Sequence, residues 1–187
     1  MKFFKPTITI LSIALCSINI AAQTTIIKNH KACGRIVYTD PRDSVAAFLL
    51  QDFMHRIADV KIPIILKSEK PGKGDIVFKR TENPQILEDG FRINTRLGYL
   101  TIESTTGKGA QYGAITLLEK YLGCNYWSEF DYTAPKSATV MIPTVDFIDN
   151  PAFRYRQSQN YSMRTDPMYT SWMRLETPFE EFAGGYW

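Results

Sequence analysis

The sequence contains few of the residues that carry most enzyme chemistry. Only three cysteines and two histidines, His30 and His55, occur among its 187 residues. It has neither an H-E-x-x-H motif nor paired C-x-x-C motifs, so it predicts no metal site. A G-x-S-x-G nucleophile elbow is also missing, which leaves serine–histidine catalysis without a recognisable motif.

The glycines in the middle of the chain do not form a nucleotide-binding motif. Gly107, Gly109 and Gly113 have the spacing G-x-G-x-x-x-G, which is one residue longer than the dinucleotide fingerprint. No G-x-x-x-x-G-K-[ST] loop occurs either. We therefore expect a turn and the start of a helix at these residues, and no cofactor.

No apolar run is long enough for a stable transmembrane helix. The most apolar segment, Ile8 to Ile20, is interrupted by four polar residues and follows the basic residues Lys2 and Lys5. The small residues Ala21-Ala22 come directly after it. This order is typical of a secretory signal peptide at residues 1–22, and it predicts a secreted or periplasmic protein.

A strong charge of either sign is also lacking. The formal charge of the chain is +3, and removal of Lys2 and Lys5 with the signal peptide lowers it to +1. A nearly neutral chain gives no electrostatic argument for binding nucleic acid or an anionic membrane.

Two cysteines, Cys33 and Cys124, remain after the predicted signal peptide, which contains Cys16. An oxidising compartment would allow a disulfide between them. The alternative is two separate thiols, with Cys124 buried as a small apolar side chain. The sequence leaves both alternatives open.

The segment from Asp89 to Gly123 predicts a β-hairpin that leads into a helix. Apolar and polar residues alternate over 91–94 and again over 99–103, on either side of a turn at 95–98. A period of two places one row of side chains against a core and the other in water. The two strands are therefore expected to be antiparallel neighbours.

The helix after the hairpin is predicted to begin at Thr106, whose hydroxyl can cap a backbone N–H, and to end at Gly123. Gly113 lies inside it, where glycine costs about 1 kcal/mol relative to alanine. We therefore expect the helix backbone to approach the sheet closely there. The apolar face consists of Ala110, Ala114, Leu117, Leu118 and Tyr121.

Another helix is predicted before the hairpin. Asp40-Pro41 has the order of an N-cap followed by proline at the first helical position. An apolar stripe then extends through Ala58 and is expected to pack on the core of the same domain. Its residues are Ala46, Leu49, Leu50, Phe53, Met54 and Ile57.

These elements predict an α/β fold, an α+β sandwich in which two helices pack on one mixed β-sheet with an antiparallel hairpin. The first two strands are expected to pair in parallel, since a helix connects them. One domain is expected over residues 23–150, with a single strand in residues 23–40. Short strands are predicted at 35–39, 62–66, 75–78, 125–127 and 139–142.

The composition changes after Asn150-Pro151. Nine of the 24 aromatic residues lie between Phe153 and Trp187, in a segment with too few elements to enclose a core. We expect residues 151–187 to be the beginning of a second, truncated domain. The alternative is a complete tail that wraps back on the first domain.

Two blocks of the sequence resemble a known family. The hairpin–helix segment with Tyr121 to Cys124, and the segment Asn150 to Arg156 (NPAFRYR), resemble the non-catalytic N-terminal domain of family 20 β-hexosaminidases and family 67 α-glucuronidases, as in secreted Bacteroidetes glycoside hydrolases. The resemblance implies that the domain packs against a (β/α)₈ barrel. Residues 151–187 would then be the start of the truncated barrel, and Phe153 to Gln157 its first strand.

The resemblance also implies a substrate-binding role for Arg156. In the hexosaminidases an arginine at the end of the first barrel strand binds sugar hydroxyls, a task that suits the fixed donors of a guanidinium. Arg156 matches that position, and Arg164 matches a second arginine. Tyr161 stands where the hexosaminidases have an aspartate, which departs from their pattern. The alternative role for Arg156 is an ion pair at the domain interface.

The resemblance implies an accessory or support domain of a secreted glycoside hydrolase, whose carbohydrate substrate binds to the missing barrel. Glycoside hydrolysis usually needs two carboxylates across the scissile bond. In these families the carboxylates lie on later barrel strands, so the catalytic residues are expected beyond residue 187. We therefore expect the chain alone to be inactive.

Two other hypotheses remain open from the sequence. The first is a stand-alone carbohydrate- or surface-binding module that uses exposed aromatic side chains as stacking platforms, with Tyr155, Tyr161, Trp172 and Trp187 as the candidates. The second is a non-functional product of a truncated reading frame.

Overall fold

The chain is built around a six-stranded mixed β-sheet, seen in a computed structural model that describes residues 23–66, 70–158 and 165–176. The sheet has the strand order β11-β6-β7-β5-β3-β4. The predicted α/β fold is confirmed. The strands are β3 (Ile36–Tyr38), β4 (Ile64–Leu66), β5 (Ile76–Arg80), β6 (Phe91–Arg96), β7 (Tyr99–Ser104) and β11 (Asp146–Asp149).

The sheet is parallel on one side and antiparallel on the other. β3 pairs in parallel with β4 and with β5, and β5 pairs in parallel with β7. β6 and β7 form the predicted antiparallel hairpin, and β11 adds to β6 in the antiparallel direction. The expected parallel pairing of the first two predicted strands, β3 and β4, is confirmed.

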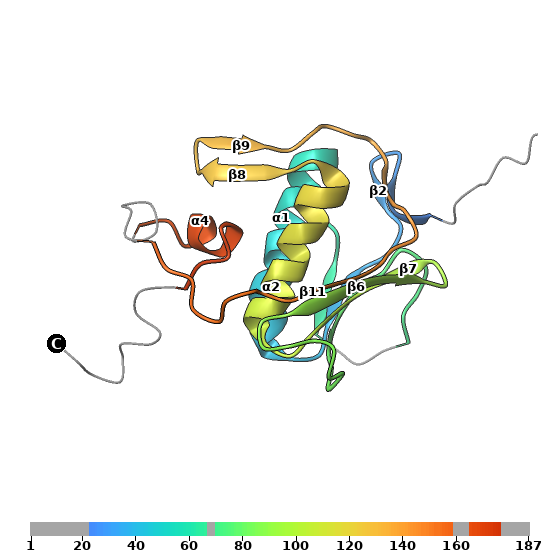
Figure 1. The fold of residues 1–187 in the computed structure, drawn as a ribbon. Helices are drawn as coiled ribbons and strands as arrows, with labels where there is room; N and C mark the ends of the chain where they lie inside the picture. Colours follow the sequence, from blue (N-terminus) through green and yellow to red (C-terminus); the bar gives the residue numbers. More distant parts are fainter. Residues whose placement is uncertain (1–22, 67–69, 159–164, 177–187) are drawn as a thin grey trace, which may run out of the picture.

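Two helices cover one face of this sheet. α1 (Ser44–Ala58) follows a short 3₁₀ helix, η1 (Pro41–Asp43), and α2 (Gly107–Thr116) continues into a π-helical turn, η2 (Leu117–Tyr121). Figure 1 shows α1 and α2 side by side, with the strands β6, β7 and β11 on one side of them and the short helix α4 (Pro167–Trp172) on the other. The helices therefore form a middle layer.

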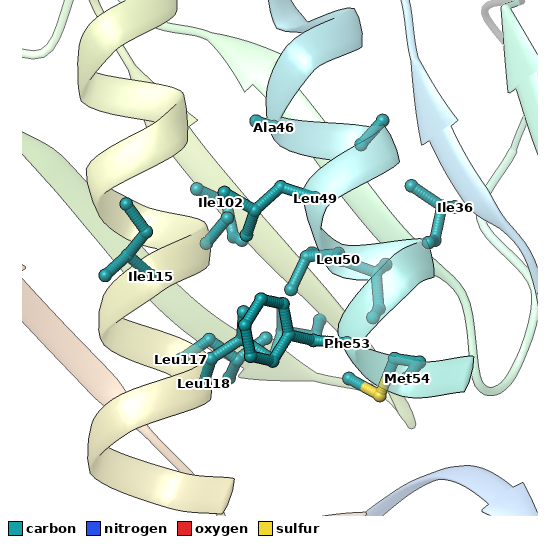
Figure 2. Close-up of a cluster of buried hydrophobic side chains, with 14 of the residues drawn as sticks. Ile36, Ala46, Leu49, Leu50, Phe53, Met54, Ile102, Ile115, Leu117 and Leu118 are labelled. Carbon is teal, nitrogen blue, oxygen red and sulfur yellow. The ribbon is translucent and has the colours of Figure 1, made fainter. Parts of the chain in front are cut away.

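The hydrophobic core lies between the helices and the sheet. Both predicted apolar stripes are buried apart from Tyr121, which is partly buried. Figure 2 shows Leu49 and Phe53 of α1 between the two helices, with Leu49 next to Ile102 of β7 and Phe53 next to Leu117 and Leu118 of η2. Phe53 is completely buried, as expected for a stripe that packs on its own domain.

The hairpin and the close helix–sheet contact follow the predictions. Leu97 and Gly98 have φ values of 54° and 84°, both in the left-handed region, which is the pattern of a tight type I′ turn. A Cβ atom at Gly113 would lie 2.5 Å from Cγ2 of Ile102 in β7. Only glycine allows α2 to approach the sheet this closely.

The predicted helix ends are also confirmed. The Thr106 hydroxyl accepts a hydrogen bond of 3.0 Å from the N–H of Gly109. Gly123 has a φ of 67°, the left-handed conformation typical of a helix end. Asp40 caps η1, and not α1 directly, by accepting from the N–H of Arg42 at 2.9 Å.

Several strands were not predicted. β1 (Thr24–Lys28) pairs with β2 (Lys31–Ala32) and with β10 (Val140–Ile142), so the expectation of one strand in residues 23–40 is wrong. The predicted strands at 125–127 and 139–142 are confirmed as β8 (Asn125–Ser128) and β10, but β9 (Asp131–Thr133), which pairs with β8, was not predicted. β1, β9 and β11 are short, and two of them pair with segments far away in the sequence, which a local pattern does not reveal.

Cys33 and Cys124 are both free thiols, so the disulfide that the sequence left open is not formed. Cys33 is exposed after β2, where its backbone packs on Gly74. Cys124 is buried after η2, with its N–H bonded to the carbonyl of Leu118. Burial raises the pKa of the Cys124 thiol to about 11, which keeps it protonated and unreactive at neutral pH.

Across the described ranges, none of the helices has both the length and the apolar character needed to cross a membrane.

Candidate functional site at the polar stripe of α2

A second face of the helix formed by α2 and η2 binds the chain that follows β11. Five polar side chains lie on it at positions i, i+3, i+4, i+8 and i+11, and each contacts a residue between Arg156 and Glu176. We call this face the polar stripe of α2. It consists of Lys108, Gln111, Tyr112, Thr116 and Glu119.

Arg156 lies at the centre of this interface. Its Nε donates a hydrogen bond of 2.7 Å to the carbonyl of Arg174, and Nη1 donates to the carbonyl of Phe153. Nη2 donates to the Tyr112 hydroxyl at 3.3 Å, while the guanidinium carbon lies 5.4 Å from the centre of the Tyr112 ring. Arg156, which the resemblance predicted to bind substrate, therefore donates its hydrogen bonds to groups of its own chain.

Two carboxylates flank the Arg156 guanidinium. Nη2 of Arg156 lies 3.9 Å from Oδ2 of Asp89 and 3.8 Å from Oε1 of Glu176. Glu176 is only 6% exposed, and its second oxygen pairs with Nζ of Lys108. Asp89 accepts a hydrogen bond of 2.6 Å from the Thr106 hydroxyl, which ties it to the start of α2. Both acids thus have cationic or hydrogen-bonding partners.

The remaining contacts extend along the stripe. The Ser171 hydroxyl donates to Oε1 of Gln111 at 3.2 Å. Nη2 of Arg174 donates to the Thr116 hydroxyl at 2.8 Å and pairs with Oε2 of Glu119 at 3.1 Å. Burial raises the pKa of Glu119, but Arg174 opposes this shift. The stripe is therefore occupied from its first turn to its last.

Burial at the stripe also fixes the protonation state of Tyr112. Burial raises the pKa of its hydroxyl, and the hydrogen bond from Arg156 opposes that shift without reversing it. The hydroxyl therefore keeps its proton at neutral pH, and its neutral oxygen accepts the hydrogen bond from the Arg156 guanidinium.

The short helix α4 adds an apolar contact to this interface. Asp166 caps α4 by accepting from the N–H of Tyr169 at 2.9 Å, and its other oxygen accepts from the Tyr126 hydroxyl at 2.9 Å. Trp172 packs on Phe53 of α1 and on Tyr126, with ring centres 4.8 Å and 5.9 Å away. Residues after β11 therefore join the core of the domain as well as its surface.

A groove of about 450 Å³ opens beside the ion pairs, at the start of α2. Three cations and three carboxylates line it: Arg42, Lys108, Arg154, Glu88, Asp89 and Glu176. Arg154 pairs with Glu88 at 3.2 Å, and Lys108 pairs with Glu176. Most of these charges thus neutralise one another across the groove.

This arrangement is suited to holding two segments together. Glycosidases place one carboxylic acid and one carboxylate on opposite sides of an open cleft. Here Glu176 is almost completely buried, and a guanidinium lies between it and Asp89. Within the described residues, no group of three or more histidine, cysteine or acidic side chains could hold a metal ion.

Four aromatic residues were the candidate stacking platforms of a stand-alone binding module, and the structure describes two of them, Tyr155 and Trp172. Trp172 is 3% exposed and belongs to the core, so its proposed stacking role is wrong. Tyr155 is half-exposed, with its hydroxyl on Gln157. Tyr161 and Trp187, like Arg164, lie outside the described residues.

The sequence did not single out most of the polar stripe. It noted Gln111 and Glu119 only as residues off the apolar face, and it did not assign a role to Lys108, Tyr112 or Thr116. The available signal was their spacing, which repeats at three and four residues beside the apolar face. Glu176 carried no signal, because its partners lie more than 15 residues away in the chain.

Comparison with known proteins gives one family match. The family model described as Glycosyl hydrolase family 20, domain 2, matches residues 19–121, which is more than half of the chain. No curated protein sequence matches the chain significantly.

Solved structures give the same fold. The Streptomyces plicatus N-acetyl-β-hexosaminidase aligns with a TM-score of 0.54 and 15% identity, over 73% of this chain and 25% of that one. The family GH20 β-N-acetylhexosaminidase of Streptomyces coelicolor A3(2) aligns with a TM-score of 0.51 and 17% identity, over 73% and 26%. The family GH115 4-O-methyl-α-glucuronidase BtGH115A aligns with a TM-score of 0.55 and 13% identity, over 71% and 19%.

The matched glucuronidase belongs to family GH115, whereas the sequence resemblance pointed to family 67. The chain corresponds to about a quarter or less of the length of each of these structures. The matching family model, the six-stranded sheet and its two covering helices together identify this chain as a member of the Glycosyl hydrolase family 20, domain 2, family.

Proposed function

We propose that this chain is the accessory domain of a secreted glycoside hydrolase and that it supports the catalytic barrel without supplying its chemistry. In this proposal residues 1–22 direct export, residues 23–150 form the supporting domain, and residues 151–187 begin the barrel. The catalytic carboxylates lie beyond residue 187, and the parent protein acts on a glycan.

One observation carries the proposal. The polar stripe of α2 contacts Arg156, Ser171, Arg174 and Glu176 along its whole length, and Trp172 packs on α1. A helix that packs on its own sheet with one face and holds the following segment with another is a rigid support. The family match supports the same role, because the aligned part of this chain covers only 19–26% of each of the solved relatives.

The contacts of Arg156 favour the ion-pair role over sugar binding. All three of its nitrogen atoms donate to groups of the chain, and its side chain is only 17% exposed. A sugar hydroxyl would have to replace one of these partners. The structure has no strand at Phe153 to Gln157, where the resemblance predicted the first barrel strand. We propose that Arg156 holds this segment on α2.

The reading frame after codon 187 provides the test. We expect it to continue into barrel strands that carry two acidic residues, and we expect the extended product to hydrolyse an aryl N-acetyl-β-glucosaminide or an aryl α-glucuronide. An extended product that folds, contains no such acids and cleaves neither substrate would contradict the proposal.

A further inference from the structure

The face of the six-stranded sheet opposite the helices is open. Along β6 and β7 the buried residues Ile93, Leu100 and Ile102 face α1 and α2, so their neighbours Asn94 and Thr101 lie on the other side. Among the described ranges no helix packs on this second face: α1 and α2 lie on the first face, and α4 contacts α2 and β8.

A groove of about 720 Å³ runs along this open face, within the size range of ligand sites. Its floor consists of cross-strand pairs, Arg92 with Glu103, Asn94 with Thr101, and Arg96 with Tyr99. These pairs offer guanidinium and amide donors, hydroxyl and carbonyl acceptors, and the half-exposed ring of Tyr99. Hydrogen-bonding groups beside an aromatic ring suit a sugar better than an apolar ligand.

Among the described residues, the groove contains three cationic side chains, and only one of them, Arg92, pairs with its carboxylates. Arg92 holds Asp146 with two hydrogen bonds of 2.7 Å and lies 3.8 Å from Glu103, so one guanidinium occupies both carboxylates of the face. The pKa of Asp146 is accordingly lowered, mainly by the hydrogen bond from Arg92. Lys79 and Arg96 are exposed and have no ion-pair partner within the described part of the chain.

The two unpaired cations lie at different heights along the sheet. Arg96 is opposite Tyr99 in β7, and Lys79 is opposite Glu103 in the same strand. The rise of a strand is about 3.4 Å per residue, so the two heights differ by roughly 13 Å. A linear chain with repeated negative groups can pair with Arg96 at one height and with Lys79 at the other.

We propose that this open face binds an acidic oligosaccharide, a glycan strand that carries uronate carboxylates. Arg96 pairs with one carboxylate through its planar donors, and Lys79 pairs with a second one further along the strand. Asn94 and Thr101 hydrogen-bond to hydroxyls between them, and the ring of Tyr99 packs on a sugar face. This function goes beyond the supporting role, since it uses the side of the sheet that faces away from the polar stripe of α2.

Titration of the full chain with tri-galacturonic acid tests the proposal, with backbone amide shifts followed by NMR. We expect saturable shifts confined to β5, β6 and β7, and weaker binding as NaCl is added. The methyl ester of the same trisaccharide keeps the sugar skeleton and removes the charge, so it should bind much more weakly.

Two variants locate the site. Arg96→Gln and Lys79→Gln should each weaken binding of tri-galacturonic acid about two- to fivefold, the range expected for an exposed ion pair. Lys136→Gln is the matched control, because Lys136 donates to the carbonyl of Arg56 at the end of α1 and lies outside the groove. Absence of saturable shifts, equal binding of the methyl ester, or unchanged affinity in both groove variants would overturn the proposal.

Discussion

At the scale of single residues, Asp43 combines a charge with almost complete burial. Asp43 is 1% exposed, and neither of its carboxylate oxygens accepts a hydrogen bond. Nη2 of Arg80 lies 2.8 Å from Oδ1 and is its nearest cation. Burial raises the pKa of Asp43 from 3.8 to about 6, although Arg80 opposes the shift. The folded chain thus binds this proton more tightly than the unfolded chain does.

This shift predicts a stability that falls as the pH rises. The contribution from Asp43 is fully present below the unfolded pKa of 3.8 and is lost as the pH rises through about 6. Only about one pKa unit of the shift lies above pH 5, so we expect Asp43→Asn to remove about 1.4 kcal/mol of this pH dependence between pH 5 and pH 7.5, on the scale of 1.36 kcal/mol per pKa unit. Urea unfolding at pH 5 and pH 7.5 measures it.

Asp59→Asn provides the matched control, because the Asp59 side chain is 85% exposed at the end of α1. Its unfolding free energy should depend on pH as that of the wild type does. A wild-type slope that survives Asp43→Asn would show that the titration of Asp43 is not its cause.

A second residue-scale prediction concerns Gly113. Alanine normally stabilises a helix interior by about 1 kcal/mol relative to glycine. At this position the added Cβ would lie 2.5 Å from Cγ2 of Ile102 and 3.3 Å from the ring of Phe91. We therefore expect Gly113→Ala to destabilise the chain by about 1–3 kcal/mol, as overpacking does, in thermal or urea unfolding.

A double-mutant cycle identifies the contact at Gly113. Ile102→Ala removes Cγ2 and leaves space for the new methyl group, so the combined variant should lose less stability than the sum of the two single variants. Additive losses would place the clash elsewhere.

At the scale of elements, α2 has two faces, and only one of them could be predicted from the sequence. The apolar face was predictable because Ala110, Ala114 and Leu117 repeat at helical spacing, which shows in the sequence whatever they pack against. The polar stripe was not, because its side chains look like solvent-facing residues until their partners, such as Glu176, are brought near. Local patterns also predicted the hairpin, while β1 and β11 depend on distant pairing.

The stripe predicts that Glu176 anchors the segment after β11. Glu176→Gln keeps the shape but leaves Lys108 and Arg156 without their shared carboxylate, and breaking a buried ion pair typically costs about 3–5 kcal/mol. Lys108 is one-third exposed, so we expect a smaller loss of about 2 kcal/mol. Unfolding by urea measures the loss, and Trp172 fluorescence reports whether α4 leaves the core.

Glu82→Gln is the control for this variant, because Glu82 is exposed in the loop after β5. It should leave both the unfolding midpoint and the fluorescence unchanged. If Glu176→Gln behaved as this control does, the ion pairs would not hold the segment on α2.

At the scale of the whole molecule, the chain has three layers with distinct tasks. The middle layer of helices packs on the sheet through the apolar core and binds Arg156 and the residues around α4 through the polar stripe of α2. On the other side of the sheet, no helix of the described ranges covers the open face. Most acidic residues in the described ranges of this family 20 domain are ion-paired or lie singly on its surface.

A direct test of the central claim is an assay of the purified chain for hydrolysis of 4-nitrophenyl N-acetyl-β-glucosaminide and 4-nitrophenyl α-glucuronide. A supporting domain predicts no turnover above the buffer rate for either substrate. Turnover that Asp89→Asn or Glu176→Gln abolishes in a folded chain would contradict the account, because it would place the catalytic carboxylates in the ion-pair cluster at Arg156.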